Sequence, residues 1–366
     1  MTVISPETLA CTGASTPYGR YLRRFWHPVL CSDALARGGA REVEILGDLI
    51  LLCRNGAGEA WAAGATCPHR GARLCLGKVE PDGVRCFYHG WKFARDGQCV
   101  DQPADGPDVV VRARIPAYPT YEALGLIFVY LGPDAPPAAM HLDRMDGIGF
   151  HKAGQLDDWP CDQFVMVENA VDWSHTAWTH ERSGLAALLP ADFTFSAKET
   201  EFGVRVFTTS PTETELTQST EFLMPNMNFF NIPLKSGRGS IWNIVWRVPV
   251  RDGLCRSFIA SFASGDEALL DEAREQLSAF EDVSPPTTEM GERLLAGEIG
   301  WDDVMDRPDL TRIEDYVTQV GQRGGSRYLY APSDEPVRLL RSILLREIRA
   351  SEAGSELKAW THLQGA

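Results

Sequence analysis

The chain has 366 residues, of which 44% are hydrophobic and 23% charged, and its formal net charge at pH 7 is −15. This apolar content suffices for one large or two smaller domains and excludes a disordered chain. The acidic balance argues against nucleic acid or an anionic membrane as a partner, because either would favour a basic face.

The sequence shows neither a targeting signal nor a disulfide pattern. The first twenty residues do not combine a basic start with an apolar run, and no apolar stretch approaches the ~20 residues that cross a bilayer. We therefore expect a cytoplasmic protein. Its nine cysteines are an odd number, so metal ligation or buried thiols explain them better than a disulfide framework.

A short segment rich in Pro and Ala divides the chain into two parts. Residues 41–130 form short β-rich runs broken by Gly, Pro and Asp, which predicts a small antiparallel domain. Residues 132–138 look like a linker. We place a lead segment at 1–24, a first domain at 25–132 and a second domain at 133–366.

The second part predicts a mixed α+β domain. Residues 162–189 carry polar and metal-ligand residue types at helical spacing, and strand-like runs follow from residue 193 to residue 262. A charged helical tail begins at residue 266 and is interrupted by Pro285, Pro286 and Pro332.

A Cys/His motif lies in the first domain. One residue separates Cys67 from His69, two separate Cys86 from His89, and sixteen lie between the two pairs. Two thiolates and two imidazoles in this arrangement are the ligands of a Rieske cluster, in which two Cys hold one iron and two His the other. A zinc site with the same ligands is the alternative, although zinc fingers usually place their two Cys together and then their two His.

Both loops resemble those of the Rieske family beyond the four ligands. The positions where that family's loops turn and pack hold matching residues here: Pro68, Gly71, Tyr88, Gly90 and Trp91. Respiratory Rieske proteins add two Cys that form a disulfide across the loops, whereas Ala72 and Tyr88 stand at those positions in this chain. The resemblance is therefore to the oxygenase and ferredoxin branch, and we read Cys75 and Cys99 as packed or free thiols.

The second domain carries two histidines that suit iron. His175 and His180 lie five residues apart, so on a regular helix they would point in different directions, and we expect His180 where the helix ends or bulges. Two imidazoles and one carboxylate, with open positions left over, form the facial triad that suits Fe(II) and O2. Two histidines near a helix end are also compatible with a structural role.

Following the Cys/His motif, this segment resembles the catalytic domain of Rieske oxygenases. Asn169, Asp172, His175 and His180 match that family's Asn-x-x-Asp-x-x-His-(x4)-His signature. The resemblance implies that both His bind iron, whereas Asp172 would connect an iron-ligating His to a cluster-ligating His of a neighbouring subunit. Glu168 and Asn169 would line the same region, and a helix cap is the alternative for Asn169.

The third iron ligand must be a carboxylate further along the chain. Several acids compete for this role: Asp282, Asp302, Asp303, Asp306, Glu314 and Asp315. The C-terminal segment resembles the phthalate dioxygenase branch, in which a helical Asp followed four residues later by Gln supplies the carboxylate. Asp315 with Gln319 matches that pattern and is our prediction, with a solvated helix surface as the alternative.

Over nearly the whole chain, the resemblance is to the alpha subunit of Rieske non-heme iron ring-hydroxylating oxygenases, in the phthalate dioxygenase and vanillate demethylase branch. It implies an N-terminal all-β Rieske domain and a C-terminal α+β catalytic domain, with an antiparallel sheet and helices of the START or helix-grip type. The implied cofactors are a [2Fe–2S] cluster, a mononuclear Fe(II) and O2 as co-substrate. The implied assembly is a homotrimer with electron transfer between subunits.

The implied reaction is monooxygenation of a small aromatic or heterocyclic substrate, by hydroxylation or oxidative demethylation. cis-Dihydroxylation is one alternative, and a Rieske electron-transfer protein or a zinc-stabilised binding protein are alternatives of other classes. The sequence contains no G-x-G-x-x-G fingerprint for a nicotinamide or flavin. Electrons from NAD(P)H would therefore arrive through a separate reductase, directly or through a ferredoxin.

Two further sets of residues are candidates for recognition. Basic side chains on the cluster loops that suit an acidic electron donor, or are ordinary surface charge, are Arg70, Arg73, Lys78, Arg85, Lys92 and Arg95. Candidates for the substrate pocket, with plain core as the alternative, are Met224, Asn226, Asn228, Phe230, Trp242 and Trp246.

Overall fold

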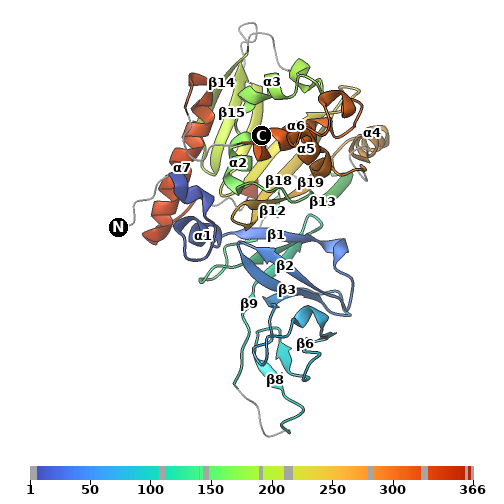
Figure 1. The fold of residues 1–366 in the computed structure, drawn as a ribbon, viewed down its shortest axis with the longest axis vertical. Coiled ribbons are helices and arrows are strands. Elements are labelled where there is room, and N and C mark those ends of the chain that lie inside the picture. Colours follow the sequence, from blue (N-terminus) through green and yellow to red (C-terminus); the bar gives the residue numbers. More distant parts are fainter. Residues whose placement is uncertain are drawn as a thin grey trace.

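The computed structural model describes residues 6–106, 112–139, 141–142, 148–188, 193–209, 217–278, 283–322, 329–358 and 362–363. The molecule is elongated (Figure 1), with the short strands β6 (Gly83–Arg85) and β8 (Cys99–Asp101) at one end. The helices α3 (Thr176–Thr179) and α6 (Leu310–Val320) lie towards the opposite end.

Three antiparallel sheets build the first part of the chain. The first orders β1 (Trp26–Cys31), β11 (Leu126–Tyr130) and β10 (Thr120–Ala123). The second orders β2 (Ala40–Ile45), β3 (Asp48–Arg54), β4 (Ala60–Gly64) and β9 (Ala117–Tyr118), and the third orders β5 (Lys78–Glu80), β6, β7 (Lys92–Ala94) and β8. Leu46 and Gly47 join β2 to β3 with φ of 52° and 80°, as a two-residue hairpin requires. The predicted all-β domain is confirmed.

One seven-stranded antiparallel sheet dominates the second part. Its spatial order is β13 (Phe150–Gln155), β19 (Leu254–Ala263), β18 (Ser240–Arg251), β17 (Met227–Pro233), β16 (Thr217–Leu223), β15 (Gly203–Thr209) and β14 (Thr194–Glu199). From β14 to β19, strands that follow one another in the chain are neighbours in the sheet. A separate parallel pair joins β12 (His141–Leu142) to β20 (His362–Leu363).

Helices accompany this sheet and confirm the predicted α+β class. They are α2 (Gln163–Asn169), α3, α4 (Glu267–Ser278), α5 (Thr287–Leu295), α6 and α7 (Glu335–Glu352), whereas α1 (Pro17–Leu22) belongs to the first part of the chain. Short 3-10 helices lie at Pro6–Ala10, Ser32–Ala34, Leu74–Leu76, Trp173–His175, Leu185–Leu188, Trp301–Asp303 and Pro332–Asp334. The long helix α7 packs against β14, β15 and α1 (Figure 1), while α6 contacts α2, α3 and α5. Across the described residues, no helix combines the length and apolar character that spanning a bilayer requires.

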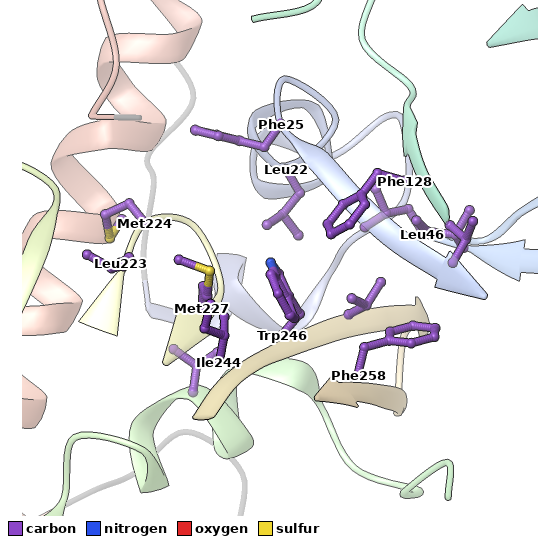
Figure 2. Packing of buried hydrophobic residues seen from close by; sticks show 14 of the residues in the cluster. Leu22, Phe25, Leu46, Phe128, Leu223, Met224, Met227, Ile244, Trp246 and Phe258 are labelled. Atoms are coloured by element: carbon purple, nitrogen blue, oxygen red, sulfur yellow. The ribbon is translucent and has the colours of Figure 1, made fainter. Parts of the chain in front are cut away.

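A continuous hydrophobic core joins the two parts of the chain. Phe128 of β11 and Trp246 of β18 meet with ring centroids 5.6 Å apart and planes at 74°, an edge-to-face contact. Figure 2 shows Trp246 pointing from the second sheet towards Leu22 and Phe128 of the first part. Burial of these large apolar side chains fixes the orientation of one sheet system on the other.

The same core corrects part of the predicted substrate pocket. Met224 and Trp246 are buried within it (Figure 2), and Trp242 stacks on Phe229 with centroids 5.1 Å apart. Met224 and Trp246 are core residues, and the partly buried Trp242 packs against the same core, because strand alternation and the turn before β17 direct them towards other apolar side chains.

Candidate functional site

Two loops with the same backbone pattern carry the Cys/His motif. The loop of Cys67 follows β4, and the loop of Cys86 joins β6 to β7. In both loops the cysteine N–H donates to the carbonyl five residues later at 2.8 Å, and the N–H of Gly71 or Gly90 donates back to the cysteine carbonyl. The two glycines have φ of 71° and 75°, values that residues with a Cβ rarely adopt. Glycine at both positions therefore shapes the two ligand loops alike.

The four side chains gather where the loops meet. Cys67 and Cys86 are buried, form no disulfide and lie close enough for their thiols to interact. The rings of His69 and His89 have centroids 4.5 Å apart, and Trp91 stacks on His69 at 4.4 Å. Burial, with Cys86 nearby, raises the pKa of the Cys67 thiol to about 11, and a bound metal would stabilise its thiolate form. Two adjacent thiols beside two imidazoles fit the donor set of a Rieske cluster.

The other two cysteines of this region take no part in the motif. Cys99 is buried and accepts a hydrogen bond from Gln102 Nε2 at 3.3 Å, and Cys75 is partly buried. Both are free thiols, as predicted.

A broken helix turns two histidines inwards in the second part. α2 ends at Asn169, a 3-10 turn ends at His175, and α3 follows directly. His180 is the C-cap of α3, with φ −101° and ψ 23°, so the helix ends where this side chain is needed. The prediction that His180 lies at a helix end is confirmed. On a regular, unbroken helix, side chains five residues apart point in different directions, so the two rings would not face the same point.

The two histidines face Asp315 of α6. Asp315 Oδ1 lies 3.7 Å from His175 Nε2 and 3.6 Å from His180 Nε2. Donor atoms of all three side chains lie within 4.8 Å of one another, so this group could hold a metal ion. Two imidazole nitrogens and one carboxylate oxygen fit the facial triad of mononuclear iron sites.

Hydrogen bonds behind both rings aim their Nε2 atoms at this point. His175 Nδ1 contacts the backbone carbonyl of Asp172. His180 Nδ1–H donates to Glu314 Oε2 at 2.9 Å, and both of these residues are buried. Because each Nδ1 is occupied, each Nε2 remains available as a ligand atom, which is the usual arrangement for metal-binding histidines.

Two amides hold the Asp315 carboxylate. Asn169 Nδ2 donates to Asp315 Oδ1 at 3.1 Å and lies 3.3 Å from His175 Nε2. Gln319 Nε2 donates to the same oxygen at 3.3 Å, so the Asp and Gln four residues apart act together on one helix face. Asn169 is the last residue of α2 and therefore does not serve as an N-terminal cap.

The other acids proposed as the third ligand lie elsewhere. Glu314 points at His180 Nδ1, on the side of the ring away from Asp315. Asp303 accepts from the N–H of Gly300 at 2.8 Å, and Asp302 and Asp306 do not belong to the donor group. Asp282 lies outside the described residues.

The carboxylate of Asp172 caps the 3-10 turn. Its Oδ1 accepts from Ser174 N–H at 3.2 Å and from Ser174 Oγ at 2.5 Å. Within one chain, the carbonyl of Asp172 rather than its carboxylate contacts His175. The side chain of Asp172 is half-buried.

A cleft opens beside His175 on the surface of the second part. Its lining comes mainly from α2, α6 and the start of α7, with these polar residues among others: Glu168, Asn169, Asp172, Gln319, Asp334 and Arg341. Glu168 and Arg341 form a bidentate ion pair in its wall. Burial raises the pKa of Glu168, and the guanidinium opposes that shift. The cleft therefore gives access to the metal-binding group through a polar wall.

The sequence did not predict the hydrogen-bond and ion-pair partners of Glu314 and Glu168. Glu314 was considered only as a ligand, although an acid next to Asp315 on a helix points about 100° away and reaches a different neighbour. The pairing of Glu168 with Arg341 joins positions 173 residues apart, and no local pattern indicates it.

A family model and several known proteins match parts of this chain. Residues 25–121 match the family model of the Rieske [2Fe–2S] domain. The chain is 35% identical over 184 residues to the tert-butanol monooxygenase / tert-amyl alcohol desaturase oxygenase subunit of Aquincola tertiaricarbonis, covering 48% of this chain and 38% of that protein. It is 44% identical over 167 residues to the phenoxybenzoate dioxygenase subunit alpha of Ectopseudomonas oleovorans, covering 45% and 40%. The chain thus spans well under two thirds of the length of these relatives.

At the level of the fold, the similarity to known proteins covers nearly the whole chain. The terminal oxygenase of carbazole 1,9a-dioxygenase from Novosphingobium sp. KA1 superposes with a TM-score of 0.62 at 20% identity, covering 92% of this chain and 96% of the other. The predicted resemblance to Rieske oxygenase alpha subunits is confirmed, and with it the [2Fe–2S] cluster for which the first domain is named. The chain therefore carries a Rieske [2Fe–2S] domain joined to a second domain in the fold of the Rieske oxygenase alpha subunits.

Proposed function

We propose that this chain is the oxygenase component of a multicomponent Rieske oxygenase, which inserts oxygen from O2 into a small aromatic or heterocyclic substrate. The observation that carries this proposal is the convergence of His175, His180 and Asp315 with both Nδ1 atoms occupied from behind. An electron carrier needs no such group, because its cluster alone performs the transfer. The second site therefore favours an enzyme over a Rieske electron-transfer protein.

In this proposal each part of the donor group has one task. The two Nε2 atoms and Asp315 Oδ1 would hold Fe(II), which supplies O2 binding and activation when bound. Asn169 and Gln319 fix the carboxylate that His175 and His180 face, so the donors keep their positions as the iron's other contacts change. Cys67, Cys86, His69 and His89 would hold the [2Fe–2S] cluster.

The position of the cluster loops supports transfer between subunits. The strand β6, which leads into the loop of Cys86, lies towards the opposite end of the molecule from α3 and α6 (Figure 1). A head-to-tail homotrimer would bring the cluster of one chain to the metal group of the next, because heterologous contacts close into rings. Asp172, which lines the cleft beside His175, would face the partner's cluster ligands there.

A separate protein would deliver the electrons. Both relatives described above are named as subunits, which agrees with a reductase or ferredoxin on another chain. The predicted basic docking face is largely neutralised: Arg73, Arg85, Lys92 and Arg95 all form ion pairs with neighbouring acids. Arg70 and Lys78, which form no ion pair among the described residues, are left for an acidic donor.

Monooxygenation, by hydroxylation or demethylation, is the proposed outcome. One relative is named a monooxygenase and the other a dioxygenase, so cis-dihydroxylation is the second candidate. The placement of the substrate relative to the metal decides between them, because the same donor group serves both reactions.

The test combines metal analysis with turnover. Fully loaded protein should contain about three irons and two labile sulfides per chain, since a two-iron cluster and a mononuclear site are both encoded. A substrate screen with a surrogate reductase, reading product and peroxide together, should then find O2-dependent oxygenation. Stoichiometric zinc without sulfide, or two irons per chain with no oxygenation, would contradict the proposal.

A further inference from the structure

An arginine spans the loop that carries Cys86 and His89. Arg85 is the last residue of β6, directly before Cys86, and its Nη1 donates to the backbone carbonyl of Gly90 at 2.7 Å. Because Gly90 follows His89, this hydrogen bond joins the two ends of the loop. The guanidinium therefore holds the peptide group that comes directly after the imidazole, through a charge-assisted hydrogen bond.

Two carboxylates keep the guanidinium of Arg85 in this position. Glu80 Oε1 accepts from its Nε at 2.8 Å, and Asp101 Oδ2 accepts from its Nη1 at 2.7 Å. Glu80 also pairs with Lys92 Nζ at 3.1 Å and so bridges the two cations. Hydrogen bonds from Arg85 and Lys92 lower the pKa of Glu80 to about 2, so this acid remains a carboxylate. The ion pairs link β5, β7 and β8 around the end of β6.

The loop of Cys67 differs at the equivalent position. The two loops share their backbone hydrogen bonds, but Thr66 precedes Cys67 whereas Arg85 precedes Cys86. A threonine side chain carries no charge. The common shape of the loops therefore does not require the arginine, which indicates a task beyond forming the turn.

The hydrogen bond from Arg85 also affects the other imidazole. The carbonyl that Arg85 holds belongs to the peptide between Gly90 and Trp91, and the Trp91 ring stacks on His69 with centroids 4.4 Å apart. A displacement of this peptide would move the ring that supports His69. One hydrogen bond therefore contributes to the placement of both histidines of the motif.

The charge of Arg85 has an effect of its own. A guanidinium stays protonated in proteins, and the Arg85 side chain is 27% exposed, so water screens its charge only in part. The reduction potential of an iron–sulfur cluster depends on net charge, on hydrogen bonds and on solvent exposure. A positive charge one residue from a ligand cysteine stabilises the reduced cluster, because reduction adds one negative charge.

We infer that Arg85 is a positioning residue that raises the reduction potential of the cluster, through its charge and by holding the carbonyl after His89. This inference rests on the proposed cluster ligands and goes beyond them, since Arg85 itself would bind no iron. Without Arg85, the charge of Lys92 would be left with three carboxylates, those of Glu80, Asp82 and Asp101, and this excess negative charge would oppose reduction. The same reasoning gives Glu80 the opposite effect on the potential.

The experiment measures the midpoint potential of the cluster in the full chain, by titration with dithionite and redox mediators, with the EPR spectrum of the reduced cluster as a second readout. Arg85→Met removes the charge and the hydrogen bond, Arg85→Lys keeps the charge, and Glu80→Gln keeps the shape without the charge. Arg95→Met is the control, because Arg95 follows the far end of β7 and pairs there with Glu59. Iron and sulfide content is measured for each variant.

Arg85→Met should lower the potential enough to shift the reduction equilibrium about tenfold, which corresponds to about 59 mV for one electron. Arg85→Lys should recover most of this shift, while the EPR g-values change in both variants because neither side chain reproduces the fork that reaches Gly90 and Asp101. Glu80→Gln should raise the potential, and Arg95→Met should leave it unchanged.

An unchanged potential in Arg85→Met would overturn the inference. A fall of the potential in Glu80→Gln would also overturn it, since a purely structural clamp would shift both variants in the same direction. If Arg85→Met does not assemble its cluster, the sign of the shift in Glu80→Gln, compared with Arg95→Met, still decides. Absence of the Rieske absorption from the unaltered chain would instead contradict the proposed ligands, and the inference with them.

Discussion

The Nδ1–H group of His180 donates to the carboxylate of Glu314 at 2.9 Å, and both side chains are almost fully buried. This hydrogen bond fixes the ring so that its Nε2 faces Asp315, the next residue along the same helix. Neighbouring acids on α6 thus act on opposite sides of one imidazole. The second carboxylate oxygen of Glu314 has no partner, so the ring is its principal contact.

Glu314→Ala should weaken binding of the mononuclear iron by roughly 10- to 100-fold, the usual effect of losing the carboxylate behind a metal-binding His. Glu314→Gln should retain more affinity, because its amide oxygen can still accept from Nδ1–H. The measurement is competition with a ferrous chelator, with the cluster absorption as an internal reference. Glu289→Gln, an exposed acid on α5, is the matched control. Unchanged affinity in Glu314→Ala would show that the contact does not orient His180.

Asp315→Ala should remove the mononuclear iron and all turnover while the cluster spectrum stays intact, because the two sites share no ligand. Iron and sulfide content and visible absorption measure both sites on one sample. Asp303→Ala is the control, since the Asp303 carboxylate accepts from the Gly300 N–H in the turn before α6 and does not belong to the donor group. Full iron and activity in Asp315→Ala, with both lost in Asp303→Ala, would show that the third ligand is misassigned.

Asp172→Asn should leave both metal sites occupied, because the amide oxygen can still accept from Ser174 and preserve the turn. Cluster reduction should persist while product formation collapses, since in the proposed trimer this variant loses the charge that would face the partner subunit. Single-turnover assays with pre-reduced cluster separate these steps. Undiminished transfer in Asp172→Asn, or a fully active monomer in sedimentation, is the result that the trimer model does not allow.

His27 should make the stability of the chain depend on pH. It is fully buried, lies 2.8 Å from the Leu22 carbonyl through Nε2, and lies 3.3 Å from Asn226 Nδ2 through Nδ1. Burial lowers its pKa from 6.5 to about 4, so between these values the unfolded chain binds a proton that the native chain excludes. Stability should therefore fall as pH decreases from 6.5 towards 4, by roughly 3 kcal/mol in full.

Urea unfolding midpoints at pH 7, 6 and 5 provide the measurement. His27→Gln should be less stable at pH 7 but should lose most of this pH dependence. His151→Gln is the comparison, because His151 is only half-buried and its pKa is lowered less completely by burial. An identical pH slope in His27→Gln and the unaltered chain would assign the effect to other groups.

The sequence by itself determined the chemistry of both metal sites, because ligand types at short spacing are local information. Cys67 with His69, and Cys86 with His89, each lie on one loop, and the glycines that shape these loops follow within the same turn. The position of His180 at a helix end followed from its spacing to His175, since a regular helix cannot direct both rings to one point. Alternating apolar runs likewise predicted the antiparallel sheets.

Only the tertiary structure decided which acid meets the histidines. Glu314 and Asp315 are adjacent, and a rotation of about 100° per residue sends one behind His180 and the other in front of it. Which face of β18 is core was also open: Trp246 packs on Phe128, whereas Arg247, one residue later, lies on the other face of the sheet and donates to Ser257 Oγ. Alternation along a strand defines two faces, but the partner that covers each face comes from distant segments, and only their packing selects it.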